Sequence, residues 1–151
     1  MRKLGITVFL ILPYILFASV SINLKNGAEV GWIGCELEYR FQDHYAFFDG
    51  FGTTLDTFTT VGGFRYYFSN EFEPGPFISL GGGVLPVSTE KISEETTQMV
   101  LPVPIFLATG GYVYYITSNW KISAEIGLIG GIVVIIPVVS PTFGVSIGYT
   151  F

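Results

Sequence analysis

Acidic and basic side chains alternate with apolar ones in one short stretch of the sequence, CELEYRF at residues 35–41. Glu36, Glu38 and Arg40 share one face if this stretch is a β-strand, because successive side chains of a strand point to opposite sides. Carboxylates and a guanidinium on one face can form ion pairs, or they can line a pathway for ions. The same reasoning places seven ionisable residues on the polar faces of predicted strands: Glu36, Glu38, Arg40, Asp49, Arg65, Lys121 and Glu125.

Groupings of residues that would support catalysis or cofactor binding are sparse. The single histidine, His44, follows Asp43 in a predicted turn and is interpreted as a solvated turn residue. With one histidine and one cysteine, the sequence predicts no His/Cys metal cluster. The glycines at 81–83 and 130–131 lack the Lys and Ser/Thr of a phosphate-binding loop, and they fit bending or close packing of strands. The sequence therefore predicts a protein that is not an enzyme and has no cofactor.

The composition indicates one domain with a mostly apolar surface. The 151 residues have a mean hydropathy of +0.56, and 17% are aromatic while only 13% are charged, about half the charged share of a usual soluble domain. Membrane-spanning helices are disfavoured, because Gly and Pro interrupt the apolar runs at 99–116 and 126–139. The net charge of −5 argues against nucleic-acid binding, and the single Cys35 cannot form an internal disulfide.

The first residues are typical of an export signal. Arg2 and Lys3 precede an apolar stretch at 4–17, and small residues follow it. We expect a signal peptide at 1–19, cleaved between 18 and 21, and a barrel domain at 20–151. A membrane anchor helix is the alternative, but the apolar stretch is 14 residues long and contains a proline, whereas a helix that spans a bilayer needs about 20 residues.

Period-two alternation recurs along the rest of the chain. The segments at 35–41, 62–68, 110–116 and 145–151 align at their final residues, and each ends with large apolar side chains on one face. A short turn-forming piece follows each of the first three, and a strand of opposite direction follows each turn. With an opening strand that ends at the dipeptide NG, the count is eight. The predicted fold is all-β: an eight-stranded antiparallel up-and-down transmembrane barrel.

The scarcity of charge decides which side of the barrel is apolar. In a soluble sandwich or lipocalin-like barrel the apolar faces would form a core, and the outer faces would need many charges. The chain has only seven basic and twelve acidic residues, so we expect the apolar faces to meet lipid and the charges to fill a narrow lumen. A buried β-core is the alternative explanation for the rings at the strand ends. In the membrane reading these form an interfacial girdle: Tyr39, Phe41, Tyr66, Phe68, Tyr112, Tyr114, Tyr149 and Phe151.

These features resemble the small eight-stranded outer-membrane β-barrel family of the OmpX, OmpW and OmpA membrane-domain type. FRYYFSNEFEPGPFISLGGG and YVYYITSNWKISAEIGL look like its periplasmic hairpins, and the aromatic terminus looks like its assembly signal. The resemblance implies a bacterial outer-membrane location, contact with outer-membrane lipid, and recognition of Tyr149 and Phe151 by the barrel assembly machinery. Some members modify lipid A. That activity is the least favoured alternative here, because His44 lies at the predicted periplasmic end.

The predicted function is a structural or surface-interaction role. Small barrels commonly fill their interiors, so the ionisable residues are interpreted as an ion-paired plug; a narrow channel is the alternative. Pro102 and Pro104 leave the register nearby open, because a shift by one residue would turn the apolar side chains around them to lipid. Without that shift, an apolar mouth for a hydrophobic ligand or partner is expected from six residues: Leu85, Val87, Leu101, Val103, Ile105 and Leu107.

Overall fold

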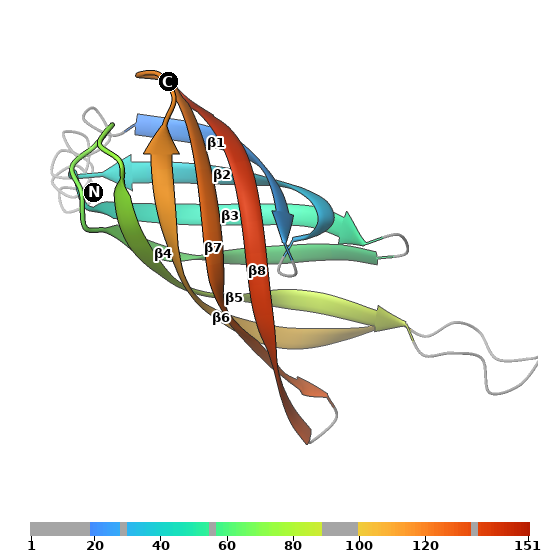
Figure 1. The fold of residues 1–151 in the computed structure, drawn as a ribbon. Coiled ribbons are helices and arrows are strands. Elements are labelled where there is room, and N and C mark those ends of the chain that lie inside the picture. Colours follow the sequence, from blue (N-terminus) through green and yellow to red (C-terminus); the bar gives the residue numbers. More distant parts are fainter. Residues whose placement is uncertain (1–18, 28–29, 55–56, 89–99, 134–135) are drawn as a thin grey trace, which may run out of the picture.

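The computed structural model describes residues 19–27, 30–54, 57–88, 100–133 and 136–151. Each strand pairs with the next, and β1 pairs with β8 to close the barrel (Figure 1). The predicted eight-stranded antiparallel barrel is confirmed. Residues 1–18 lie outside the described residues, so the leader and its cleavage site stay predictions. The strands are β1 (Ser19–Gly27), β2 (Gly31–Phe41), β3 (Tyr45–Thr54), β4 (Thr57–Tyr67), β5 (Gly75–Ser88), β6 (Val100–Tyr115), β7 (Trp120–Val133) and β8 (Ile136–Thr150).

The strands carry polar side chains inside and apolar side chains outside. In β1, Ser21, Asn23 and Lys25 are buried, while the residues between them are exposed: Lys25 is 5% exposed and Leu24 is 61% exposed. This arrangement is the inverse of a soluble domain, and it suits a hydrocarbon environment because closure satisfies the backbone groups. Among the described residues, no helix is long and apolar enough to cross a membrane.

The two ends of the described barrel domain meet at the β1–β8 seam. The Phe151 backbone N–H donates to the Val20 carbonyl oxygen at 2.9 Å, and the hydroxyls of Ser21 and Thr150 are 2.9 Å apart. We call this end of the barrel the terminal end; it also carries the short connections at 42–44, 68–74 and 116–119. The opposite end is the loop end.

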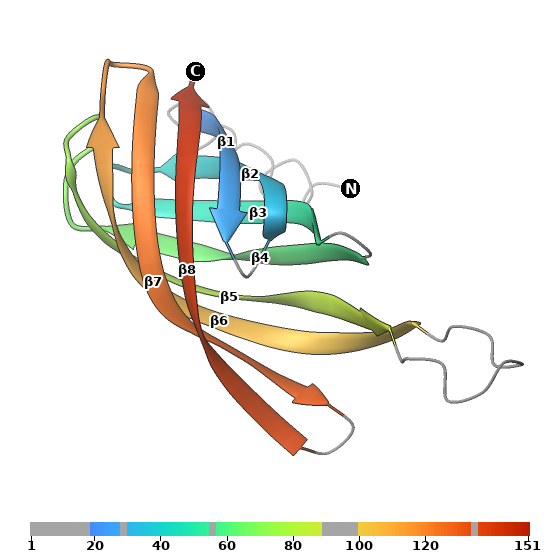
Figure 2. The same ribbon diagram turned by 45° about the vertical axis from the view of Figure 1, so that its right-hand side comes forward.

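The wall of the barrel is taller on one side than on the other. Strands β1 to β4 have 9 to 11 residues, whereas β5 to β8 have 14 to 16. Pairing of β8 with β1 stops at Gly144, and pairing of β6 with β7 stops at Ile105. Beyond these points β5–β6 and β7–β8 continue as two separate ribbons (Figures 1 and 2).

The predicted girdle residues lie on the outward face near the terminal end. All eight are at least partly exposed, and several of their rings contact one another, as in Tyr66–Phe68 with centroids 5.1 Å apart. Tyr149 lies between Trp120 and Phe151, with centroid distances of 5.2 and 5.0 Å. The aromatic end of β8 therefore packs against β7 at the level where a girdle would meet a membrane interface.

Candidate functional site

Arg65 is the centre of a buried ion-pair cluster in the lumen. From β4 it reaches two carboxylates of β2: its guanidinium is 3.0 Å from Glu36 and also pairs with Glu38. It approaches Glu125 of β7 at 3.9 Å, and its Nε donates to the Ser79 hydroxyl of β5 at 2.9 Å. The Arg65 side chain thus links its own strand, β4, to β2, β5 and β7. Of these three, only β5 is next to β4 in the sheet.

Two lysines complete the charge balance of this cluster. The Lys25 ammonium is 3.1 Å from Glu36 and also pairs with Glu125, and Lys121 is 2.6 Å from Glu38. Each carboxylate therefore contacts two cations, and three positive charges offset three negative ones. Buried charges require such pairing. We call these six residues the ionic cluster: Lys25, Glu36, Glu38, Arg65, Lys121 and Glu125.

Neutral donors satisfy further carboxylate lone pairs of the ionic cluster. The Tyr67 hydroxyl donates to Glu38 at 2.6 Å, Asn23 Nδ2 donates to Glu36 at 3.1 Å, and the Thr109 hydroxyl donates to Glu125 at 3.1 Å. Sequence reasoning missed Lys25 and these donors. The alternation in SVSINLK could have found Lys25 and Asn23, because Ser21, Asn23 and Lys25 occupy one face of that strand.

Arg40 lies in the lumen but belongs to a separate contact set nearer the terminal end. Its guanidinium donates to the backbone carbonyls of Asp43 and Ser69, the latter at 2.9 Å, and to the Tyr115 hydroxyl at 3.3 Å. It also lies 4.1 Å from the centroid of the Tyr67 ring. Arg40 therefore ties two connecting turns to the lumen wall.

The prediction for Asp49 is wrong: its side chain is on the outer face of β3. Asp49 pairs across the sheet with Leu37, which also points outward. The inward positions of β3 belong to Ala46 and Phe48, which are buried. Since Phe47 and Phe48 are both apolar and successive, the sequence of this strand does not reveal which face is inside.

Apolar clusters flank the ionic cluster on both sides. Arg65 touches both, with its Cζ 5.0 Å from the Phe48 ring centroid and 4.7 Å from that of Phe77. Inward glycines make room for these rings, because a Cβ at Gly63 would lie 2.7 Å from Phe48 and one at Gly111 would lie 2.5 Å from Phe77. The upper apolar cluster, toward the loop end, consists of Val30, Phe48, Val61, Leu107 and Ile129; the lower one consists of Ala46, Tyr67, Phe77, Val113 and Tyr115.

The residues expected to form an apolar mouth face the lumen where they are described. Register is continuous through Pro102 and Pro104, so Val103, Ile105 and Leu107 are buried rather than turned to lipid. Leu107 packs into the upper apolar cluster, which fills space that an open mouth would need. Leu85 is half-buried, and the side chains of Val87 and Leu101 lie outside the described part.

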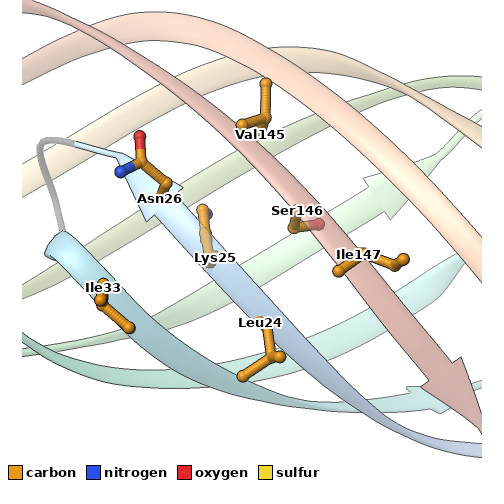
Figure 3. A pocket seen from close by; sticks show the side chains of 8 residues that line it. Leu24, Lys25, Asn26, Ile33, Val145, Ser146 and Ile147 are labelled. Carbon is orange, nitrogen blue, oxygen red and sulfur yellow. The ribbon is translucent and has the colours of Figure 1, made fainter.

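A shallow groove of about 410 Å³ lies elsewhere, on the outer wall at the β1–β8 seam (Figure 3). Leu24 and Ile33 line it from β1 and β2, and Val145 and Ile147 line it from β8. These four side chains are exposed on the outward face. The groove therefore faces lipid rather than the lumen.

The terminal end holds the only histidine. A ring nitrogen of His44 lies 3.1 Å from the Tyr67 carbonyl oxygen, and the imidazole ring lies 5.9 Å from the Tyr66 ring, measured between centroids. Within the described part of the chain, no group of three or more His, Cys, Asp or Glu residues is placed to hold a metal ion.

Comparison with known proteins gives matches in structure but not in sequence. No protein-family model matches the chain, and no curated protein sequence matches it. The N-terminal β-barrel domain of Pseudomonas aeruginosa OprF superposes with a TM-score of 0.55 at 16% identity, covering 89% of this chain and 96% of that domain. Neisserial surface protein A (NspA) gives 0.57 at 13% identity, covering 88% and 92%. The fold is that of the small eight-stranded outer-membrane β-barrels.

A third match has the same architecture. Ail, the attachment invasion locus protein of Yersinia pestis, solved in complex with the heparin analogue sucrose octasulfate, gives a TM-score of 0.50 at 15% identity, covering 89% and 96%. Together with the apolar outer face, this fold suits a bacterial outer membrane, where the exposed side chains of the wall contact lipid. The predicted resemblance is confirmed at the level of fold.

Proposed function

We propose that this protein is a closed outer-membrane barrel with a structural or surface-interaction role, not a channel and not an enzyme. The observation that carries the proposal is the filled lumen: the ionic cluster is paired throughout and contacts apolar clusters on both sides through Arg65. An ion that entered would have to displace paired, buried charges from their partners, which is costly in a low-dielectric interior.

The uneven wall supports a surface role. The β5–β6 and β7–β8 ribbons extend past the shorter β1–β4 wall (Figure 2). Their outer parts lie beyond the strand pairs that close the barrel, so closure does not depend on the side chains there. Two of the similar structures are described as a surface protein and an attachment protein. A cell-surface partner that contacts these ribbons is therefore the role we propose.

Conductance and stability together test the filled lumen. The full chain, refolded into planar bilayers, is expected to give no steady current. Glu36→Gln with Glu38→Gln is expected to destabilise the barrel, because Arg65 and Lys121 lose ion-pair partners, and still to give no steady current. A stable pore in the unaltered protein that these changes abolish would favour the narrow channel instead.

A hydrophobic-ligand barrel is the second candidate, and the inward apolar side chains of Val103 and Ile105 favour it. Titration of the refolded barrel with a fluorescent fatty acid distinguishes the two roles. Saturable binding that Val103→Asp reduces would support the ligand role. Binding that does not saturate would leave the surface role.

We also propose that β8 carries the assembly signal. The Phe151 N–H closes the seam with Val20, and the Phe151 ring packs on Tyr149. Phe151→Ser is expected to slow assembly in cells but to leave refolding into detergent intact, as followed by heat-modifiable migration on a gel. Equal slowing in both settings would indicate a folding role alone.

A further inference from the structure

Asp49 is a carboxylate on the lipid-facing wall, approximately halfway along β3. It lies four residues from Tyr45 at the terminal end of the strand, so the usual rise and tilt of barrel strands place it about 10 Å from the level of that ring. That depth is inside the hydrocarbon rather than among headgroups. A short Asp side chain cannot extend from there to water as Lys or Arg can.

The outward side chains around Asp49 are otherwise free of charge. In the described strands, Lys25, Arg40, Arg65 and Lys121 all face the lumen, and Asp49 is the one ionisable Asp, Glu, Lys or Arg that faces outward. No hydrogen bond or ion pair joins Asp49 to another described residue. Ionisable groups in a membrane-spanning segment are rare and usually have a functional partner.

The wall next to Asp49 has a shape that would admit a partner. On one side, the cross-strand neighbours Gly62 and Gly82 leave the surface low, and the Asp49 carboxylate lies 3.5 Å from where a Gly62 Cβ would be. On the other side, a groove of about 280 Å³ is lined by Asp49 with Leu37 and Phe47. Small residues permit close approach of another backbone within a membrane.

We propose that this wall binds the lipid-facing side of another membrane-spanning protein, which presents a Lys or Arg at the depth of Asp49. Charge complementarity selects that partner, because an ion pair would compensate the carboxylate in hydrocarbon. A second copy of this chain fits poorly, since its described strands offer no outward cation. The inference rests on the barrel fold and is independent of the proposed surface role.

The first test is the stability of the full chain refolded alone in phosphatidylcholine vesicles. Without its partner the carboxylate faces lipid, so Asp49→Leu is expected to lower the unfolding equilibrium constant in urea several-fold. Thr60→Leu is the matched control, because Thr60 is also outward and exposed and lies two residues along β4 from Gly62, the cross-strand partner of Asp49. The effect of Thr60→Leu should be smaller. An equal or opposite effect of Asp49→Leu would show that Asp49 does not face hydrocarbon and would overturn the proposal.

The second test locates the partner in the native membrane. A photo-crosslinking residue at Phe47 is expected to capture one membrane protein at a site beside a Lys or Arg of its spanning segment. Asp49→Asn should lower the yield about tenfold, the change that a loss of about 1.4 kcal/mol produces, and Asp43→Asn in the aqueous turn should not. A crosslinker at Ile126, outward on β7, should not capture that protein. No adduct, an adduct indifferent to Asp49→Asn, or an adduct with another copy would each overturn the proposal.

Discussion

The ionic cluster and the upper apolar cluster fill adjoining parts of one lumen by different means. In the ionic cluster, each cation pairs with carboxylates on other strands, so the loss of one cation leaves buried carboxylates without full charge compensation. Leu107 and Val61 pack by shape, so a truncation there removes only the contacts of the missing atoms. We therefore expect the two parts to respond differently to mutation. Removing one charge should destabilise the whole ionic cluster, whereas truncating an apolar side chain should lower the free energy of unfolding in proportion to the volume removed.

Arg65→Met should give the largest effect of the single changes considered. It leaves Glu36 with Lys25 and Glu38 with Lys121 alone, and we expect a loss of about 3–5 kcal/mol in the free energy of unfolding. Urea titration in vesicles, followed by heat-modifiable migration, measures it. Arg40→Met is the matched control, because Arg40 donates to backbone carbonyls and a tyrosine hydroxyl. Equal losses for the two variants would contradict the special status of the ionic cluster.

Leu107→Ala should have the next largest effect. Leu107 is buried among Val30, Phe48 and Val61, and its truncation is expected to cost about 2–4 kcal/mol of unfolding free energy. Ile126→Ala provides the comparison, since Ile126 is 70% exposed on the outer wall and leaves no internal cavity. A loss at Leu107 no greater than that at Ile126 would show that the upper lumen is not packed.

Tyr67→Phe should have the smallest effect and sharpens the comparison within the ionic part. It removes the 2.6 Å hydrogen bond to Glu38 but leaves both cations in place, so we expect a loss of about 1–2 kcal/mol. Tyr114→Phe, on the exposed outer face, should be nearly neutral in the same urea titration. A loss as large as that of Arg65→Met would mean that the hydroxyl, not the charge balance, holds the cluster together.

Alternation predicted the fold and most of the lumen, because a strand with one polar face assigns each side chain to a side. Glu36, Glu38, Arg65, Lys121 and Glu125 lie inside as that pattern requires. The pairing within the cluster was not predictable, since it joins strands that are distant in the chain, such as β2 and β7.

The sequence predictions of lumen residues are wrong or incomplete where alternation is weak, or where a clear alternation was not applied to every residue of the strand. In YAFFDGFG both faces carry phenylalanine, so the pattern does not show that Phe48 packs inside, against Arg65 and within the upper apolar cluster. The prediction for Asp49 is wrong for that reason. Lys25 was missed although its strand alternates cleanly. Alternation does not predict the lower apolar cluster either. Tyr67 shares its strand face with Arg65, and Tyr115 shares its face with Gly111, yet their rings pack together with Phe77 and Val113.

β8 extends past the end of β1, so within the described strands the part of β8 beyond Gly144 has no neighbour on its β1 side. The Thr150 N–H donates to a carbonyl of the β6–β7 connection, and the Phe151 N–H donates to β1. Since the register of β8 is unbroken, the backbone N–H groups of its odd-numbered residues point toward the β1 side. β1 ends opposite Gly144. The next four odd-numbered positions of β8 are 143, 141, 139 and 137, and two of them are Pro141 and Pro137. A proline has no N–H to donate. A neighbouring chain that extended the sheet along this edge of β8 would find every second N–H donor missing, which disfavours edge-to-edge pairing there.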